Sequence, residues 1–243
     1  MTELAKVGRL DRALFARGLV ASRSQAESYI RLGKVTVDGR IVTKAGFFVR
    51  PTSSIVLHQS EQFVSRAALK LQSVALKLKL NFLHKVILDV GSSTGGFTDF
   101  ALSRGADKAI CVDVGTDQLH PKLRQDPRVE LHEKTDIRTF TTDQAIDLVL
   151  IDVSFISLRE VLPFIARLIR PKAQVVAMVK PQFEAGAKLK SRGVIKNNTE
   201  RRQILHDFEH WVQGYFIIEA KADSEVRGTH GNQERFYLLK RAR

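Results

Sequence analysis

A glycine-rich stretch, Asp89–Phe100, is the first part of the chain whose residue types could bind a ligand. Its sequence is DVGSSTGGFTDF, and it follows Val86–Val90, an apolar run rich in β-branched residues that predicts a buried strand. Glycine lets the backbone turn sharply and lets a ligand approach it closely. Strand, glycine turn and a following helix are together typical of the nucleotide-binding start of a Rossmann-like sheet. Taken alone, the stretch fits either a cofactor loop or a tight structural turn.

Charged residues at the predicted ends of strands favour the cofactor loop. They are Asp89, Asp113, Asp136, Asp152 and Lys180. In doubly wound sheets, ligands bind beyond the carboxyl ends of the strands. One charge at such a position is ordinary, whereas five beside one glycine loop indicate a site. Asp113 follows the glycines by about 20 residues, which suits an acid that hydrogen-bonds ribose hydroxyls; a strand-end cap is the alternative.

The loop differs from two common nucleotide-binding patterns. Ser93 stands where the dinucleotide pattern GxGxxG requires its second glycine, and no Gly-Lys-Ser/Thr follows as in a Walker loop. The sheet is expected to end in an antiparallel strand, and no second mononucleotide-binding half is evident. The missing GxGxxG pattern, the antiparallel last strand and the absence of a second half favour S-adenosylmethionine over a dinucleotide as the cofactor. A Ser/His/Asp hydrolase site lacks the supporting G-x-S-x-G motif.

The elements that must position these residues alternate between strands and helices. Helical spacing predicts an amphipathic helix after Phe63 and further helices over Leu158–Ile169 and about Thr199–Val212. The last two strands are expected at Phe216–Ala220 and Arg235–Lys240. This order predicts an α/β fold with a doubly wound sheet that an antiparallel hairpin closes.

The first sixty residues have a different character, with ten Lys and Arg against four Asp and Glu. Leu10–Leu14 has helical spacing, and a second helix is expected to start near Ser24, whose spacing to Glu27 is that of a capping box. Asp38-Gly39 is a strong hairpin turn signal between short strands. Two short basic helices and a small hairpin sheet form a compact arrangement that is typical of nucleic-acid binding.

Composition narrows the classes of function. The chain has 243 residues and a net charge of +13, a basic surplus that commonly marks nucleic-acid binding, although a solvated basic surface is the alternative. The single Cys111 excludes an internal disulfide and a Cys-based metal cluster. His206 and His210 lack a third ligand, so no metal is expected. No signal-peptide core and no apolar stretch of about 18 residues is present, so we expect a cytoplasmic protein without membrane contact.

The residues RLDRALFARGLVASRSQAESYIRLGKVTVDGRIV closely resemble the RNA-binding domain first seen in ribosomal protein S4. The resemblance covers about residues 8–58 and implies that a basic helical face binds structured RNA. The basic residues expected there are Arg9, Arg12, Arg17, Arg23, Arg31, Lys34 and Arg40. Arg-Leu-Asp also occurs in the catalytic motif of pseudouridine synthases. At a helix start, however, we expect Asp11 to be structural or to position RNA.

Six further segments resemble, in order, the TlyA (haemolysin A) family of ribosomal RNA 2′-O-methyltransferases, part of the wider FtsJ-like group. They are SRAALKL, LDVGSSTGGFTD, VDVG, IDVSFISL, VKPQFE and RGTHGNQERF. The resemblance implies a Rossmann-like class I methyltransferase sheet with an antiparallel last strand, preceded by a small α+β RNA-binding domain. The expected domains are 1–59 for RNA binding, a linker at 60–64, and a methyltransferase domain at 65–243. Some relatives carry a basic-aromatic linker with tryptophan where this chain has Glu61-Gln62-Phe63.

The family's Lys-Asp-Lys-Glu pattern falls on Lys70, Asp152, Lys180 and Glu234. We expect Lys180 to be the base and Lys70 to be a neighbouring cation that could also orient the hydroxyl. Asp152 would steer Lys180 and lie near the methyl group, and Glu234 would orient Lys70 or the ribose. Without the resemblance, Lys70 would be taken as a solvated charge on a helix. The residues expected to bind the cofactor's methionine side are Asp89, Gly91, Ser93, Gly95, Gly96 and Phe97, with Asp113 at the ribose and Asp136 at the adenine.

The resemblance therefore implies methyl transfer from S-adenosylmethionine to a ribose hydroxyl, expected on a cytidine, in structured ribosomal RNA or ribosomal subunits. A non-catalytic RNA-binding or ribosome-assembly factor that keeps the fold is the alternative. The haemolysin name suggests a third class, membrane lysis, but no amphipathic membrane helix supports it.

Overall fold

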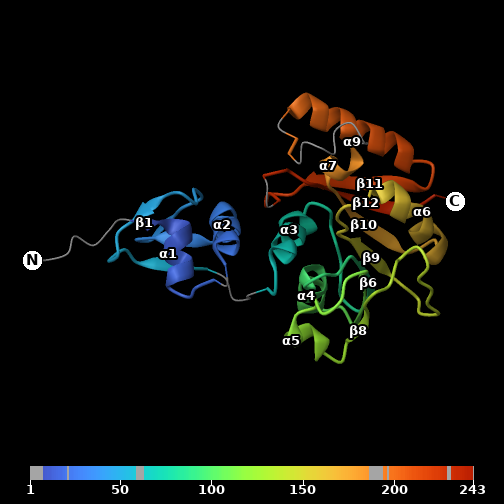
Figure 1. Ribbon diagram of the computed structural model, residues 1–243, viewed down its shortest axis with the longest axis horizontal. Coiled ribbons are helices and arrows are strands. Elements are labelled where there is room, and N and C mark those ends of the chain that lie inside the picture. Colours follow the sequence, from blue (N-terminus) through green and yellow to red (C-terminus); the bar gives the residue numbers. More distant parts are fainter. Residues whose placement is uncertain are drawn as a thin grey trace, which may run out of the picture.

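The computed structural model describes residues 8–20, 22–58, 63–185, 194–195, 197–228 and 231–242. A small N-terminal part lies beside a larger α/β part (Figure 1). The predicted linker at 60–64 falls mostly outside the described residues, because these resume at Phe63. None of the described helices combines the length and the apolar character that a membrane-spanning helix requires.

The N-terminal part consists of two helices and two small sheets. The helices are α1 (Leu10–Ala16) and α2 (Arg23–Arg31). One sheet has the order β3-β2-β5, and β1 pairs with β4 in the other. The strands are β1 (Gly8–Arg9), β2 (Val35–Val37), β3 (Arg40–Ile41), β4 (Phe48–Val49) and β5 (Ile55–Leu57). Its core includes Leu10, Leu14, Tyr29 and Ile30, all fully buried.

The start of α2 corrects the predicted capping box. Ser22 has extended backbone angles, and its hydroxyl accepts a hydrogen bond from the backbone N–H of Gln25 at 3.2 Å. Ser22 is therefore the N-cap, and the helix begins at Arg23, before the predicted cap Ser24.

The larger part is built on a seven-stranded sheet with the order β11-β12-β10-β9-β6-β7-β8. Its strands are β6 (Val86–Val90), β7 (Lys108–Val112), β8 (Val129–His132), β9 (Leu148–Ile151), β10 (Gln174–Val179), β11 (Phe216–Asp223) and β12 (Arg235–Arg241). The strands from β10 to β8 pair in parallel. β12 runs antiparallel to both β10 and β11. The predicted doubly wound sheet with a closing antiparallel hairpin is confirmed.

Helices cover both faces of this sheet (Figure 1). The helices are α3 (Arg66–Ala75), α4 (Gly96–Ser103), α5 (Pro121–Arg124), α6 (Leu158–Leu168), α7 (Pro181–Glu184) and α9 (Asn198–Val212). Successive strand residues point to opposite faces, so Ile87 packs with the α3 and α4 side chains while Leu88 packs with those of α6 and α9. This burial on both faces explains why the central strands are almost continuously apolar.

Candidate active site

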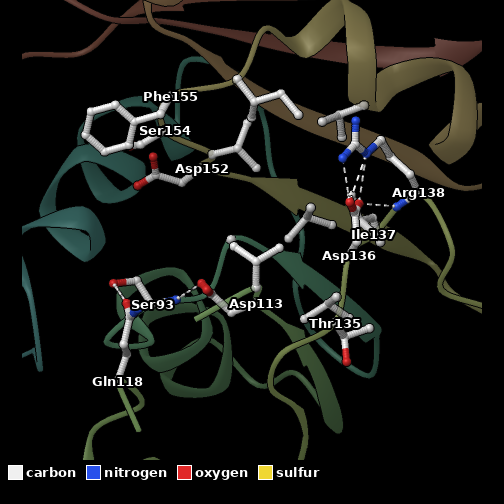
Figure 2. A pocket seen from close by; sticks show the side chains of 17 residues that line it. Ser93, Asp113, Gln118, Thr135, Asp136, Ile137, Arg138, Asp152, Ser154 and Phe155 are labelled. Carbon is white, nitrogen blue, oxygen red and sulfur yellow. Dashed lines mark hydrogen bonds and ion pairs between the residues drawn. The ribbon is translucent and has the colours of Figure 1, made fainter. Parts of the chain in front are cut away.

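The sheet register brings four strand ends together at the carboxyl edge. Val90 lies opposite Val112 on one side and Ile151 on the other, and Ala177 in β10 lies opposite Ile151. The loops that follow these strands must therefore leave the sheet side by side. Figure 2 shows the side chains of Ser93, Asp113, Asp136 and Asp152 around one cavity at this edge.

Gly91 lets the loop after β6 pass close to the loop after β9. Its φ is +78°, and a Cβ at this position would lie 2.7 Å from the carbonyl oxygen of Asp152. Few residues with a side chain tolerate that backbone conformation, and none would tolerate the contact. The position therefore requires glycine for the shape of the site.

Asp113 holds the glycine loop from the neighbouring strand. Its carboxylate accepts hydrogen bonds from the backbone N–H groups of Ser93 at 2.8 Å and Gly115 at 2.7 Å. The Ser93 hydroxyl donates to Gln118 at 3.0 Å. Asp113 thus serves as a strand-end cap and also lines the cavity. A carboxylate has further lone pairs, so the two roles are compatible.

The cavity at this edge has a volume of about 450 Å³, within the usual range for small-molecule sites. Apolar walls come from Val112, Val114, Ile137 and Val153, and polar groups come from the loops after β6 to β9. Asp136 lies at its far end, where the guanidinium of Arg138 pairs with it at 2.6 Å. This hydrogen-bonded pair holds the pKa of Asp136 below its ordinary value.

A second cavity of about 150 Å³ shares Gly91, Ser93, Asp152 and Ser154 with the first. Asp89 and Ser92 also line it. The Oδ1 atom of Asp89 and the hydroxyl of Ser92 are buried without a hydrogen-bond partner among the described residues.

Only one carboxylate oxygen of Asp89 has hydrogen-bond partners among the described residues. Its Oδ2 atom accepts hydrogen bonds from the backbone N–H of Thr98 at 3.0 Å and from the Thr98 hydroxyl at 2.7 Å. Burial raises the pKa of Asp89 to about 7 in spite of these bonds. Buried polar atoms normally have partners, so the free acceptors beside this cavity fit a polar ligand with N–H or O–H groups.

The remaining predicted loop residues differ in position. Gly96 and Phe97 line the smaller cavity, whereas Gly95 lines neither cavity. Gly95 has φ +89°, and a Cβ there would collide with Leu119 and Leu123. Gly95 therefore shapes the packing beneath the loop.

Two buried lysine–carboxylate pairs complete the edge. The Lys180 ammonium lies 2.6 Å from Asp152 Oδ1 and donates to the Ser154 hydroxyl at 2.7 Å. The Lys70 ammonium donates to Glu234 Oε1 at 2.9 Å. Burial raises the pKa of Glu234, while the charge of Lys70 opposes the shift. Asp152 and Lys180 also act on this pKa, so the structure brings all four predicted residues into one electrostatic cluster.

Separate elements deliver the four side chains. Lys70 projects from α3, Asp152 and Lys180 directly follow β9 and β10, and Glu234 directly precedes β12. A Cβ on Gly228 would lie 2.7 Å from the Glu234 carboxylate, so the backbone at Gly228 passes close to that acid.

Phe155 lines the larger cavity and was not predicted as a site residue. Its side chain is 90% exposed, its φ is +65°, and its ring centroid lies 5.3 Å from that of Phe183. A bulky residue rarely adopts positive φ, and an exposed aromatic ring can stack on a nucleobase. The only sequence signal was its place inside IDVSFISL, directly after Ser154 and three residues after Asp152.

The predicted RNA-binding residues fall into two groups. Arg9 and Arg23 both donate to the buried carboxylate of Asp11, each with a contact of 3.0 Å. Arg17 donates to the carbonyls of Pro51 and Ser53, and Arg31 pairs with Glu27. The other group is exposed and forms no ion pair within the described part of the chain: Arg12, Lys34 and Arg40.

Asp11 thus has a structural role in arranging two arginines. Burial acts to raise the pKa of Asp11, but the hydrogen bonds from Arg9 and Arg23 outweigh it, so the pKa lies below its ordinary value. Elsewhere in the described residues, no group of His, Cys, Asp and Glu side chains has the arrangement of a metal site.

Comparison with known proteins gives two family matches. Residues 63–241 match the model of the FtsJ-like methyltransferases, and residues 8–55 match that of the S4 domain. The chain is 38% identical to the 16S/23S rRNA (cytidine-2′-O)-methyltransferase TlyA of Mycobacterium tuberculosis, with 98% of this chain and 91% of that protein covered. It is 34% identical to Hemolysin A of Brachyspira hyodysenteriae, over 93% of this chain and 97% of that protein.

A solved structure is similar over both parts of the chain. It is that of a candidate hemolysin from Streptococcus thermophilus, with a TM-score of 0.71 and 34% sequence identity. The similarity covers 98% of this chain and 90% of that one.

Proposed function

The chain belongs to the FtsJ-like methyltransferase family, and from this premise we propose that it transfers a methyl group from S-adenosylmethionine to a ribose 2′-hydroxyl of ribosomal RNA. The observation that carries the proposal is the cluster of two lysine–carboxylate pairs at the cavities, in which Asp152 lines both cavities and Lys180 lines the smaller one. The TlyA relative is named for cytidine 2′-O-methylation, so we take a cytidine as the target. We therefore also propose that the protein works in the cytoplasm, with ribosomal RNA or a ribosomal subunit as its partner.

The two cavities fit the two ends of the cofactor. The larger one, with apolar walls and Asp113 and Asp136, would hold the adenosine. The smaller one, with the free acceptor of Asp89, would hold the methionine end, whose ammonium group needs hydrogen-bond acceptors. Their shared residues Asp152 and Ser154 lie where the two ends of the cofactor would join. The bound cofactor supplies a methyl group activated by a sulfonium charge.

The chain's own residues would align the nucleophile and take its proton. The methyl group would pass to the ribose oxygen while the electron pair of the carbon–sulfur bond stays on sulfur, and Lys180 would take the hydroxyl proton. A lysine side chain can take a proton only through the nitrogen lone pair of its uncharged amine. Asp152 and Ser154 fix the direction of the Lys180 amine. Correct alignment of reacting groups can lower a barrier by several kcal/mol.

Lys70 and Glu234 would orient the ribose. Glu234 Oε2 is buried without a partner among the described residues, so it can accept a hydrogen bond from a hydroxyl. Phe155 would stack on a base at the mouth of the cavity, and the arginines held by Asp11 would contact RNA phosphates.

The Lys180→Ala variant tests the proposed chemistry. We expect transfer of radiolabelled methyl groups to ribosomal RNA to fall by about a hundredfold or more, as with the loss of other general bases. Cofactor binding, measured by calorimetry, should persist. The matched control is Lys172→Ala, because Lys172 is an exposed lysine just before the opposite end of β10.

Two results would contradict the proposal. Wild-type transfer by Lys180→Ala would refute the assigned base. Failure of the wild-type protein to bind S-adenosylmethionine would favour a non-catalytic RNA-binding or assembly factor.

A further inference from the structure

Glu184 is a buried acid that the proposed chemistry does not use. It is the last residue of α7, and its side chain is 1% exposed. One carboxylate oxygen accepts a hydrogen bond from the Ser157 hydroxyl at 2.5 Å, and the other accepts one from the backbone N–H of Leu158 at 2.7 Å. Leu158 is the first residue of α6. The carboxylate therefore lies at the N-terminal end of that helix, where negative charge is favoured.

The same acid joins the two loops that carry Asp152 and Lys180. Lys180 directly precedes α7, while Asp152 and Ser154 lie in the connection from β9 to α6. At one end of the two loops, Lys180 contacts Asp152 and Ser154. In the middle, the rings of Phe183 and Phe155 are 5.3 Å apart, and Glu184 makes the contacts at the other end.

Neither loop has enough local structure to hold its shape unaided. Helix α7 contains only four residues, and a single helical turn fixes many dihedral angles for few hydrogen bonds. The other loop contains Phe155 at positive φ, a conformation that persists only where surrounding contacts impose it. A contact between the loops can therefore determine where their side chains point.

Burying the carboxylate of Glu184 costs free energy, which a purely structural contact does not require. Burial raises its pKa, although hydrogen bonds from Ser157 and Leu158 oppose the shift. A buried charge can often be replaced by apolar side chains without loss of stability. The useful property of this acid is the geometry of its two hydrogen bonds.

We propose that Glu184 is a positioning residue for methyl transfer, which fixes the Asp152–Ser157 loop against the loop that carries Lys180. The inference rests on the proposed function, because it assumes that Lys180 and Asp152 act in the reaction. Glu184 touches neither RNA nor cofactor in this scheme and acts only through the loop that it holds.

Three variants of the full chain test the inference: Glu184→Ala, Glu184→Gln and Asp147→Ala. A glutamine can accept from Leu158 with its oxygen and donate to Ser157 with its nitrogen, so Glu184→Gln should retain the geometry. Asp147 accepts a hydrogen bond from the backbone N–H of Val86 at 2.9 Å. It directly precedes β9, at the opposite edge of the sheet from Asp152, and so provides a matched carboxylate without contact to the site.

We expect Glu184→Ala to lower kcat about thirtyfold with a KM for RNA within about threefold of wild type, since a small misplacement of reacting groups mainly affects the chemical step. Glu184→Gln and Asp147→Ala should stay within about threefold of the wild-type kcat. Amide hydrogen exchange over residues 152–158 should accelerate in Glu184→Ala alone. This second measurement requires no activity.

The results separate this inference from the proposed function. Wild-type kcat and unchanged exchange in Glu184→Ala, together with an inactive Lys180→Ala, would overturn the positioning role alone. A lower melting temperature of Glu184→Ala without a change in kcat would also overturn it. Activity of Lys180→Ala would instead reject the assigned base, and the exchange measurement would still decide whether Glu184 holds the loop.

Discussion

Lys70 and Lys180 are ammonium groups with 8% and 9% exposure, and each faces a carboxylate. A buried charge is tolerated only with a partner, so the pairs explain how two lysines can remain at the sheet edge. Pattern alone makes Lys70 an ordinary helical lysine. Its partner Glu234 lies 164 residues further along the chain, a separation at which local sequence gives no information. Only the family resemblance connected the two residues.

Asp89 should make the stability of the folded protein depend on pH. Burial raises its pKa from the ordinary value of 3.8 to about 7. Between about pH 4 and pH 7 the folded protein therefore binds a proton that the unfolded chain has released, and stability falls as pH rises through this window. Three pKa units correspond to a loss of about 4 kcal/mol.

Urea unfolding at pH 5 and pH 7.5 tests this prediction. Asp89→Asn should lose less stability over this range than the wild type. Asp126→Asn is the control, because Arg128 holds the pKa of that carboxyl below its ordinary value, outside the window. Equal pH dependence in Asp89→Asn and the wild type would show that Asp89 does not titrate as inferred.

At the scale of elements, the sequence predicted the strands and helices around the site well. The apolar run Val86–Val90 and the helical spacing after Phe63 became β6 and α3. The predicted capping residue of α2 was wrong because Ser22 and Ser24 both precede a plausible helix. Only the backbone angles of Ser22 and the hydrogen bond that it accepts from Gln25 identify it as the cap. The role of Gly95 could not be predicted, since Leu119 and Leu123 approach it only in the folded chain.

Gly96 sets the distance between α3 and α4, and its replacement should affect both stability and catalysis. A Cβ at Gly96 would contact the Ser65 hydroxyl and lie 2.8 Å from Ala67 Cβ and 2.9 Å from the backbone nitrogen of Ala68. The Cβ of Ala67 and the backbone nitrogen of Ala68 cannot rotate away, so α3 itself must move. Helix α3 carries Lys70. We expect Gly96→Ala to cost about 1–3 kcal/mol in the free energy of unfolding, the usual range for overpacking, and to lower kcat.

Urea unfolding and methyl-transfer kinetics measure the two effects of Gly96→Ala. Gly214→Ala is the matched control, because its nearest neighbour would be a backbone oxygen at 3.5 Å, an ordinary contact. If both variants had the same stability and kcat as the wild type, close packing of α3 on α4 would not be required.

At the scale of the whole molecule, hydrogen bonds hold the start of the larger part, Phe63 and Val64, to α2 and α4. Gln25 of α2 donates to the carbonyl of Phe63 at 3.3 Å, and Asp99 of α4 accepts from the backbone N–H of Val64 at 2.9 Å. Helix α2 also lies next to α3, which carries Lys70 (Figure 1). RNA held by the N-terminal part would therefore be held close to the part that performs the reaction. Sequence predicted the two parts but not these contacts.

Specific contacts of the N-terminal part should contribute to RNA binding, in addition to the attraction from the net charge of +13. Arg23 is half-exposed, and Asp11 fixes its direction, so its guanidinium is oriented before RNA arrives. Loss of one phosphate contact lowers the slope of log affinity against log salt by about 1. We expect this change in Arg23→Ala, measured by filter binding to ribosomal RNA at several salt concentrations.

The control is Arg202→Ala. Arg202 is an exposed arginine on α9, so this variant removes the same charge and should leave the slope unchanged. Equal slopes in the two variants would mean that overall charge, rather than the S4 domain, determines how RNA binds.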